Sequence, residues 1–174
     1  MIAEIKIRKA TIDDASNLAA LCCKTFYDTY HVFNTKENME MFLEQHFTIN
    51  KIINELNDVA NTFVLLFERD ELCGYAKITE SKAPVRLVSL AVIEIARIYS
   101  IKEKIGKGIG KLLMDECVAI AKQKKKQFIW LGVWKENKRA ISFYQKNGFE
   151  IFDEQNFILG KDVQNDWLMK KEIF

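Results

Sequence analysis

A glycine-rich turn in the second half of the chain limits what this sequence can fold into more than any other feature. The turn runs from Ile105 to Lys111 and joins a β-prone run, Leu90 to Ser100, to a helical pattern that begins at Ile109. Unpaired backbone N–H groups and the positive end of the helix dipole converge there, so an anion can bind. Glycine also lets a bulky phosphate approach the backbone, because no Cβ stands in the way.

Two common phosphate-binding patterns do not fit this turn. A Walker loop needs glycine, four residues and then Gly-Lys-Ser/Thr, but Ile105 and Leu112 stand at two of its fixed positions. A dinucleotide-binding turn reads GxGxxG, and Lys111 breaks that spacing. Taken alone, the turn therefore fits either an anion site or a glycine-rich turn that serves chain geometry only.

The composition predicts one globular domain that spans residues 1–174. The chain has 174 residues, 49% of them hydrophobic, and this size and apolar content suit a single core. One proline and seven glycines leave no linker-like stretch that would mark a domain boundary.

Charge, hydropathy and cysteine spacing argue against several classes of function. Lys and Arg total 26 against 24 Asp and Glu, so strong electrostatic binding to nucleic acid is not expected. The sequence has no apolar run of membrane-spanning length, and its N-terminal residues do not resemble a signal peptide. The cysteines lack zinc-site spacing, which predicts no metal site and reduced core thiols in a cytoplasmic protein: Cys22, Cys23, Cys73 and Cys117.

Hydrophobic periodicity predicts alternating strands and helices in a mixed α/β layer structure. The predicted strands are 5–9, Thr62–Phe67, Leu72–Glu80, Leu90–Ser100, Phe128–Val133, Phe149–Phe157 and Trp167–Glu172. The predicted helices are one that begins at Thr11, two between Lys36 and Leu56 with a break near Thr48, one from Ile109 to the basic run Lys122–Lys126, and one over Lys138–Asn147. Gly148 then suits a left-handed helix cap.

A second motif follows the glycine turn and makes a family resemblance specific. Residues Trp130 to Phe149 read WLGVWKENKRAISFYQKNGF, and they come after the turn KGIGKLL. In this order the two motifs resemble the GNAT superfamily of acetyl-CoA-dependent N-acetyltransferases over roughly Ile93 to Phe149. The resemblance implies an α/β fold with a central, mostly antiparallel and partly splayed sheet of about six to seven strands, flanked by about four to five helices.

The resemblance also implies a set of residues that bind acetyl-CoA. The glycine turn would hold the pyrophosphate, the end of the preceding strand the pantetheine arm, and Asn137 a further part of that arm. Ile105 departs from the Gln or Arg usual in the family, and Lys104 is expected to replace part of that contact. Read from the residues alone, the strand is an ordinary sheet strand and Asn137 a helix N-cap. The implied residues are Ile98, Tyr99, Ser100, Ile105, Gly106, Lys107, Gly108, Ile109, Gly110, Lys111, Asn137 and Tyr144.

Two side chains carry the chemistry that the resemblance implies. Tyr144 matches the general acid that protonates the departing thiolate; its helical spacing alone would make it a core tyrosine, as it does Phe143. Glu94 matches a base that acts through water, with Glu80 as a second candidate, and each fits an ion-paired surface carboxylate equally well. The resemblance also implies direct transfer without an acyl-enzyme, and neither His31 nor His46 has Asp or Cys partners at a recognised spacing.

The acceptor is predicted to be a primary amine. Three parts of the sequence resemble the bacterial spermidine/spermine acetyltransferase branch, which implies a polyamine: Thr25 to Tyr30, Glu37 to Met39 followed by Phe42 and Leu43, and Trp130 to Trp134. Small amines, a protein N-terminus and a lysine remain alternative acceptors. For the assembly, a homodimer is a possible state. A coenzyme-A-binding sensor or interaction module without transferase activity is the alternative from another class, and a structural module without cofactor is a third. Four acidic residues could attract a polyamine: Asp28, Glu37, Glu40 and Glu44.

Overall fold

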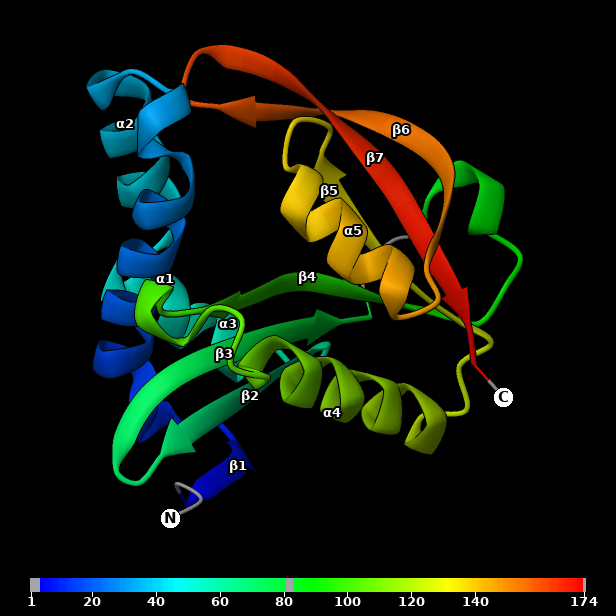
Figure 1. Cartoon of the computed structure of the whole chain (residues 1–174), viewed down its shortest axis with the longest axis horizontal. Helices are drawn as coiled ribbons and strands as arrows, with labels where there is room; N and C mark the ends of the chain where they lie inside the picture. The colour runs from blue at the N-terminus through cyan, green and yellow to red at the C-terminus, as the bar shows by residue number, and fades with distance from the viewer. Residues whose placement is uncertain (1–3, 81–82, 174) are drawn as a thin grey trace.

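A seven-stranded sheet organises the protein in the computed structural model, which describes residues 4–80 and 83–173 (Figure 1). The strand order is β1-β2-β3-β4-β5-β7-β6, and every neighbouring pair is antiparallel except β4 and β5. This arrangement confirms the mixed α/β class and the mostly antiparallel sheet. The strands are β1 (Ile5–Lys9), β2 (Asn61–Glu68), β3 (Glu71–Thr79), β4 (Val92–Ser100), β5 (Phe128–Trp134), β6 (Glu150–Leu159) and β7 (Asp162–Glu172).

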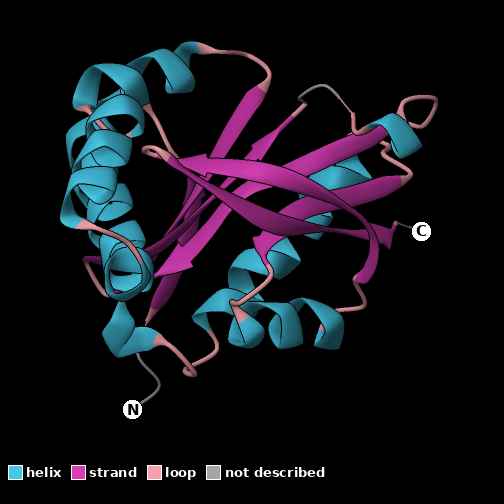
Figure 2. Ribbon diagram, turned by 90° about the horizontal axis from the view of Figure 1, so that it is seen from above, coloured by secondary structure: helices cyan, strands magenta, loops and turns pink. Residues whose placement is uncertain are grey.

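Helices cover both faces of the sheet (Figure 2). On one face lie α1 (Ala15–Tyr30), α2 (Lys36–His46) and α3 (Ile49–Asn57); on the other lie α4 (Ile109–Gln123) and α5 (Lys138–Lys146). The predicted break near Thr48 is confirmed, because the Thr48 hydroxyl accepts a hydrogen bond from the Lys51 N–H and starts α3. Gly148, with φ +85°, follows α5 in the predicted left-handed conformation.

The hydrophobic core falls into two clusters that help to orient the sheet. The larger packs the helices onto both faces and includes Cys22, Cys73 and Cys117, which are buried free thiols as predicted, while Cys23 is partly buried. The smaller one joins Leu87, Val92, Trp130 and Leu168. Since alternate residues of a strand share a face, this smaller cluster identifies which side chains of β4, β5 and β7 point to the same side.

The C-terminal strands differ from the prediction. β6 and β7 are joined at Gly160, whose φ of +62° makes a tight turn, and β7 begins at Asp162 rather than at Trp167. The first half of β7 is polar, so hydrophobic periodicity could not reveal it. No helix in residues 4–80 and 83–173 is long and apolar enough to cross a membrane.

Candidate active site

β4 and β5 separate along their length and leave a gap in the sheet. They pair at Val92–Glu94 against Phe128–Trp130, whereas β4 continues along β3 to Ser100 and β5 continues along β7 to Trp134. A bulge at Ala96, between the pairs formed by Ile95 and Arg97, bends β4 at the start of the gap. Backbone groups of residues 95–100 on this side are therefore available to a ligand, as the predicted splayed sheet requires.

A cavity of about 590 Å³ occupies this gap. Most of its lining comes from the free end of β4, the glycine turn before α4 and one face of α5, and residues at the end of α1 and on β5 complete it. The predicted cofactor residues that line it are Ile98, Tyr99, Ser100, Ile105, Gly106, Gly108, Gly110, Lys111, Asn137 and Tyr144. The structure thus brings together residues from two sequence motifs around one cavity, and its size suits the extended arm of a ligand.

The geometry of the glycine turn suits a diphosphate. Gly106 and Gly108 have φ values of +79° and +87°, and no described heavy atom lies within 4 Å of the point where a Cβ would stand on either residue. α4 begins at Ile109, so its first N–H groups face the same open space. The short helical turn Lys102–Lys104 separates β4 from the glycines, a detail that the sequence did not predict.

The other members of the turn differ in their surroundings. The ammonium of Lys104 is held by Glu68 and that of Lys111 by Asp115, although both residues line the cavity. Ile109 is 2% exposed and packs its side chain into the core, so only its backbone could contact a ligand. Lys107 is exposed and does not contribute to the described cavity lining.

Tyr144 lies on α5, belongs to the hydrophobic core and also lines the cavity. It is 8% exposed and packs against Phe143 and Phe149 at ring-centroid distances of 5.5 and 5.9 Å. Burial raises the pKa of Tyr144, so the phenol keeps its proton at neutral pH and can donate it. The core and catalytic interpretations of this residue are thus compatible.

One face of α5 supplies cavity residues that sequence reasoning missed. Arg139, Ser142 and Lys146 line the cavity, and so does Phe143, which also packs against the core as predicted. Their spacing of three and four residues, one helical face, is the signal that could have revealed them. Asn137 combines both roles weighed for it: its side-chain oxygen accepts a hydrogen bond from the Ala140 N–H at 3.2 Å, and it lines the cavity.

The opposite side of the gap forms a second surface, which we call the acceptor face. Trp130 on β5 belongs to the smaller core cluster, so Gly132 and Trp134, two and four residues later, point to the same side. Tyr30 and Phe33 pack on the Trp134 ring at centroid distances of 6.2 and 5.1 Å. A second cavity of about 370 Å³ adjoins these rings.

Glu94 and Glu80, the two carboxylates predicted as candidate bases, lie in different surroundings. Glu94 is partly buried, opposite Thr79 and Trp130, outside the described cavity lining. Its position two residues from Val92 puts it on the acceptor face. Glu80 forms ion pairs of 2.5 Å with Lys124 and Lys126, whose hydrogen bonds lower its pKa. Glu80 is therefore engaged away from the cavity.

A third carboxylate, Asp166 on β7, was missed by sequence reasoning. It is 7% exposed, and burial raises its pKa to about 6. It pairs across the sheet with Trp134 on one side and Gln155 on the other. No sequence signal singled it out, since it lies in the polar half of β7 that periodicity did not predict.

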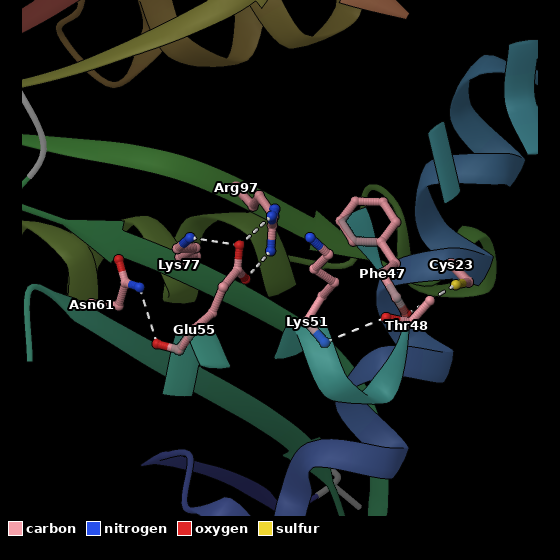
Figure 3. A network of polar contacts seen from close by, with 8 residues as sticks. All are labelled: Cys23, Phe47, Thr48, Lys51, Glu55, Asn61, Lys77 and Arg97. Atoms are coloured by element: carbon pink, nitrogen blue, oxygen red, sulfur yellow. Dashed lines mark hydrogen bonds and ion pairs between the residues drawn. The ribbon is translucent and has the colours of Figure 1, made fainter. Parts of the chain in front are cut away.

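A buried ion network fixes β4 from behind (Figure 3). The Arg97 guanidinium donates two hydrogen bonds to Glu55 of α3, at 2.7 and 2.8 Å, and the Lys77 ammonium lies 2.9 Å from the same carboxylate. Burial pushes the pKa of Glu55 up, but the two cations bring it below its ordinary value. Arg97 also lies over the Phe47 ring at 4.8 Å and lines the main cavity, so the network holds the strand next to the bulge.

The histidines take no part in the cavity lining. His31 stacks on Tyr27 and His46 packs on Phe42, at centroid distances of 4.6 and 4.3 Å. Burial lowers the pKa of His46, which keeps it neutral. Within residues 4–80 and 83–173, no group of three His, Cys, Asp or Glu side chains is arranged to hold a metal ion.

Comparisons with known proteins agree with this geometry. Residues 23–149 match the model of the acetyltransferase (GNAT) family. An uncharacterised N-acetyltransferase in the pepI 3' region of Lactobacillus delbrueckii subsp. lactis is 33% identical, with 97% of this chain and 98% of that protein covered. The spermidine N(1)-acetyltransferase of Thermoplasma acidophilum is 29% identical, with 92% of this chain and 99% of that protein covered.

A solved structure supports the same conclusion. The PaiA N-acetyltransferase of Thermoplasma acidophilum, determined in complex with coenzyme A, superposes with a TM-score of 0.81 at 26% identity, covering 97% of this chain and 99% of that one. The splayed strands, the open glycine turn and the cavity between them agree with the coenzyme A complex of that neighbour. The chain therefore belongs to the GNAT family and is an acetyl-CoA-dependent N-acetyltransferase.

Proposed function

We propose that this enzyme moves the acetyl group of acetyl-CoA directly onto a primary amine, with polyamines as the acceptor class. The observation that carries the proposal is the gap between β4 and β5, where the cofactor cavity adjoins a second cavity that includes Tyr30, Phe33 and Trp134 in its lining. Two substrates held in adjoining cavities can meet without a covalent enzyme intermediate.

Each step of the reaction has a residue to serve it. The amide N–H groups at the start of α4 bind the diphosphate, and the free backbone of residues 98–100 binds the pantetheine arm. As the amine nitrogen forms its bond to the acetyl carbon, the C–S bond breaks and Tyr144 gives its phenolic proton to the thiolate. Such a proton transfer is typically worth about 10² to 10⁴ in rate.

The amine must lose a proton in the same reaction, because its ordinary pKa near 10 keeps it charged at neutral pH. We propose that a carboxylate on the acceptor face takes this proton. The family resemblance names Glu94, which would act through water because it lies outside the described cavity lining. Asp166 is the second carboxylate on this face, and it too lies outside the described lining of both cavities.

The polyamine assignment rests on similarity to a spermidine N(1)-acetyltransferase and on the aromatic and acidic acceptor face. Asp28 and Glu136 line the second cavity, and each also forms an ion pair, Asp28 with Lys24 and Glu136 with Lys138. Glu37 and Glu40 lie outside the described lining of this cavity and pair with Lys161 and Lys36. Attraction of a polycation is therefore assigned to the cavity mouth rather than to α2.

The test is a panel of acceptors with acetyl-CoA, read by release of free thiol. Polyamines, amino acids and lysine-bearing peptides are compared at matched concentrations. We expect spermidine to give the largest kcat/KM. Turnover with peptides but not with polyamines would contradict the acceptor class, and tight acetyl-CoA binding without turnover on any amine would favour the sensor interpretation.

The unpaired thiols support a cytoplasmic enzyme, because disulfides are rare in that reducing compartment. We also propose that residues 1–174 form a single domain and that the enzyme is a homodimer. Sedimentation of the purified chain tests the homodimer.

A further inference from the structure

Asp166 is a buried carboxylate for which the fold supplies no cation. It is 7% exposed, and among the described residues its side chain has no hydrogen bond or ion pair. The side chains beside it on the neighbouring strands, Trp134 and Gln155, are uncharged, and Tyr30 is the titratable group that faces it from α1. Keeping an unpaired carboxylate in such a place costs stability, so a ligand of opposite charge is the natural partner.

Gly132 links this carboxylate to the cofactor cavity, whose described lining does not include Asp166 itself. The Oδ2 atom of Asp166 lies 3.3 Å from the point where a Cβ would stand on Gly132, and Nε2 of Gln155 lies 3.1 Å from the same point. Gly132 itself lines the cofactor cavity, next to Val133. Because residue 132 has no side chain, none from this position covers the carboxylate.

Aromatic rings complete the surroundings of a cation. Trp134 lies directly across the strand pair from Asp166, and Tyr30 and Phe33 pack on the Trp134 ring. Ring faces attract ammonium groups, and the methylene chain of an alkyl amine can pack on the same rings. Burial is the largest cause that raises the pKa of Tyr30, and the negative charge of Asp166 raises it further.

We infer that Asp166 binds the ammonium group of the acceptor and takes its proton as the nitrogen attacks the acetyl carbon. This inference rests on the proposed N-acetyltransferase reaction and assigns to Asp166 the role for which the family resemblance names Glu94. Two N–H bonds of the ammonium break. The first proton goes to the Asp166 carboxylate, where an O–H bond forms, and this frees the lone pair of the nitrogen. The second proton leaves to solvent as the new N–C bond replaces the C–S bond. Before the next cycle Asp166 releases its proton to solvent, and Tyr144 takes one up to replace the proton that it gave to the thiolate. Burial places the pKa of Asp166 at about 6, so the group is charged at neutral pH yet a better base than an exposed aspartate.

The experiment compares Asp166→Asn with Asp162→Asn, an exposed aspartate of the same strand. With the best amine of the panel, Asp166→Asn should lower kcat/KM by about 100-fold or more at pH 7. The loss should shrink as the pH rises, because more amine is then neutral and needs no base. Acetyl-CoA affinity, measured by calorimetry, should be unchanged, and Asp162→Asn should match the wild type throughout.

A second measurement does not depend on turnover. Spermidine is titrated into the complex of the enzyme with coenzyme A, and its binding should weaken at least tenfold in Asp166→Asn. Equal spermidine binding and equal kcat/KM in the variant would overturn the inference while leaving the proposed function intact. Acetyl-CoA binding without acetylation of any amine by the wild type would instead contradict the proposed function.

Discussion

Arg97 and Glu55 form a two-pronged ion pair that ties β4 to α3, with both hydrogen bonds shorter than 2.9 Å. Arg97 is the residue after the Ala96 bulge, so the pair clamps the strand where it leaves β5. The pair therefore anchors β4 to α3 at the start of the gap, and Figure 3 shows Arg97 and Lys77 on the Glu55 carboxylate.

Breaking this pair should destabilise the fold. Glu55→Ala leaves the buried Arg97 and Lys77 cations without their carboxylate, a loss of about 3 to 5 kcal/mol for a buried pair. Urea unfolding measures it, with Glu44→Ala, an exposed position, as the control. Equal unfolding free energies for the two variants would mean that the network carries little of the stability.

The glycine turn predicts a charge effect on acetyl-CoA binding. Gly108→Asp puts a carboxylate beside the diphosphate site, and Gly108→Asn puts an uncharged side chain of the same shape at the same φ of +87°. We expect the Asp variant to bind acetyl-CoA at least tenfold more weakly than the Asn variant in calorimetry. Matching affinities would place the diphosphate elsewhere.

Tyr144 offers a test of acid catalysis. Tyr144→Phe deletes the phenolic proton and keeps the ring packing, so turnover should fall more than tenfold while acetyl-CoA affinity barely changes. Single-turnover kinetics and calorimetry separate the two quantities. If the acetylation rate is unaltered, Tyr144 is a core residue with no part in the chemistry.

Glu94 is distinguished from Asp166 by its pH profile. Because Asp166 is the proton acceptor in our inference, Glu94→Gln should lower kcat/KM by less than tenfold and by a similar factor at every pH. Glu80→Gln, an ion-paired carboxylate away from the cavity, is the matched control. A loss in Glu94→Gln that grows toward low pH would transfer the role to Glu94.

Asp166 also predicts how stability depends on pH. Its pKa is about 6 in the folded state against 3.8 ordinarily, so between about pH 4 and pH 6 the folded state keeps a proton that the unfolded state has lost. The contribution of this group to stability therefore falls as pH rises through that window. The free energy of unfolding of Asp166→Asn should exceed that of the wild type by about 3 kcal/mol above pH 6 and should match it near pH 4. Urea unfolding at both pH values measures the difference; a pH-independent gap would contradict the burial argument.

The sequence reveals those parts of the site that lie in continuous motifs. The glycine turn and Asn137 could be predicted because local spacing determines a turn and a helix start, and the structure brings both to one cavity. The order of helices could be predicted for the same reason, since apolar periodicity follows the face that each helix buries.

Groups whose properties come from distant neighbours could not be found this way. Asp166 owes its burial to side chains on two other strands, and no pattern near position 166 indicates them. Lys104 shows the converse, because the turn suggested a free cation but Glu68 of β2 neutralises it. Only the folded arrangement decides which charges remain available to a ligand.

The short seam between β4 and β5 has a mechanical consequence. Three residue pairs join them, at the end of β4 opposite the glycine turn. The two halves of the sheet are thus joined by hydrogen bonds near one end of β4 and β5 only, and thermal motion can widen the separation of their unpaired ends. An extended molecule lying between the edges bridges them. The relative motion of β4 and β5 is therefore larger in the enzyme without acetyl-CoA, and it decreases when the ligand occupies the gap.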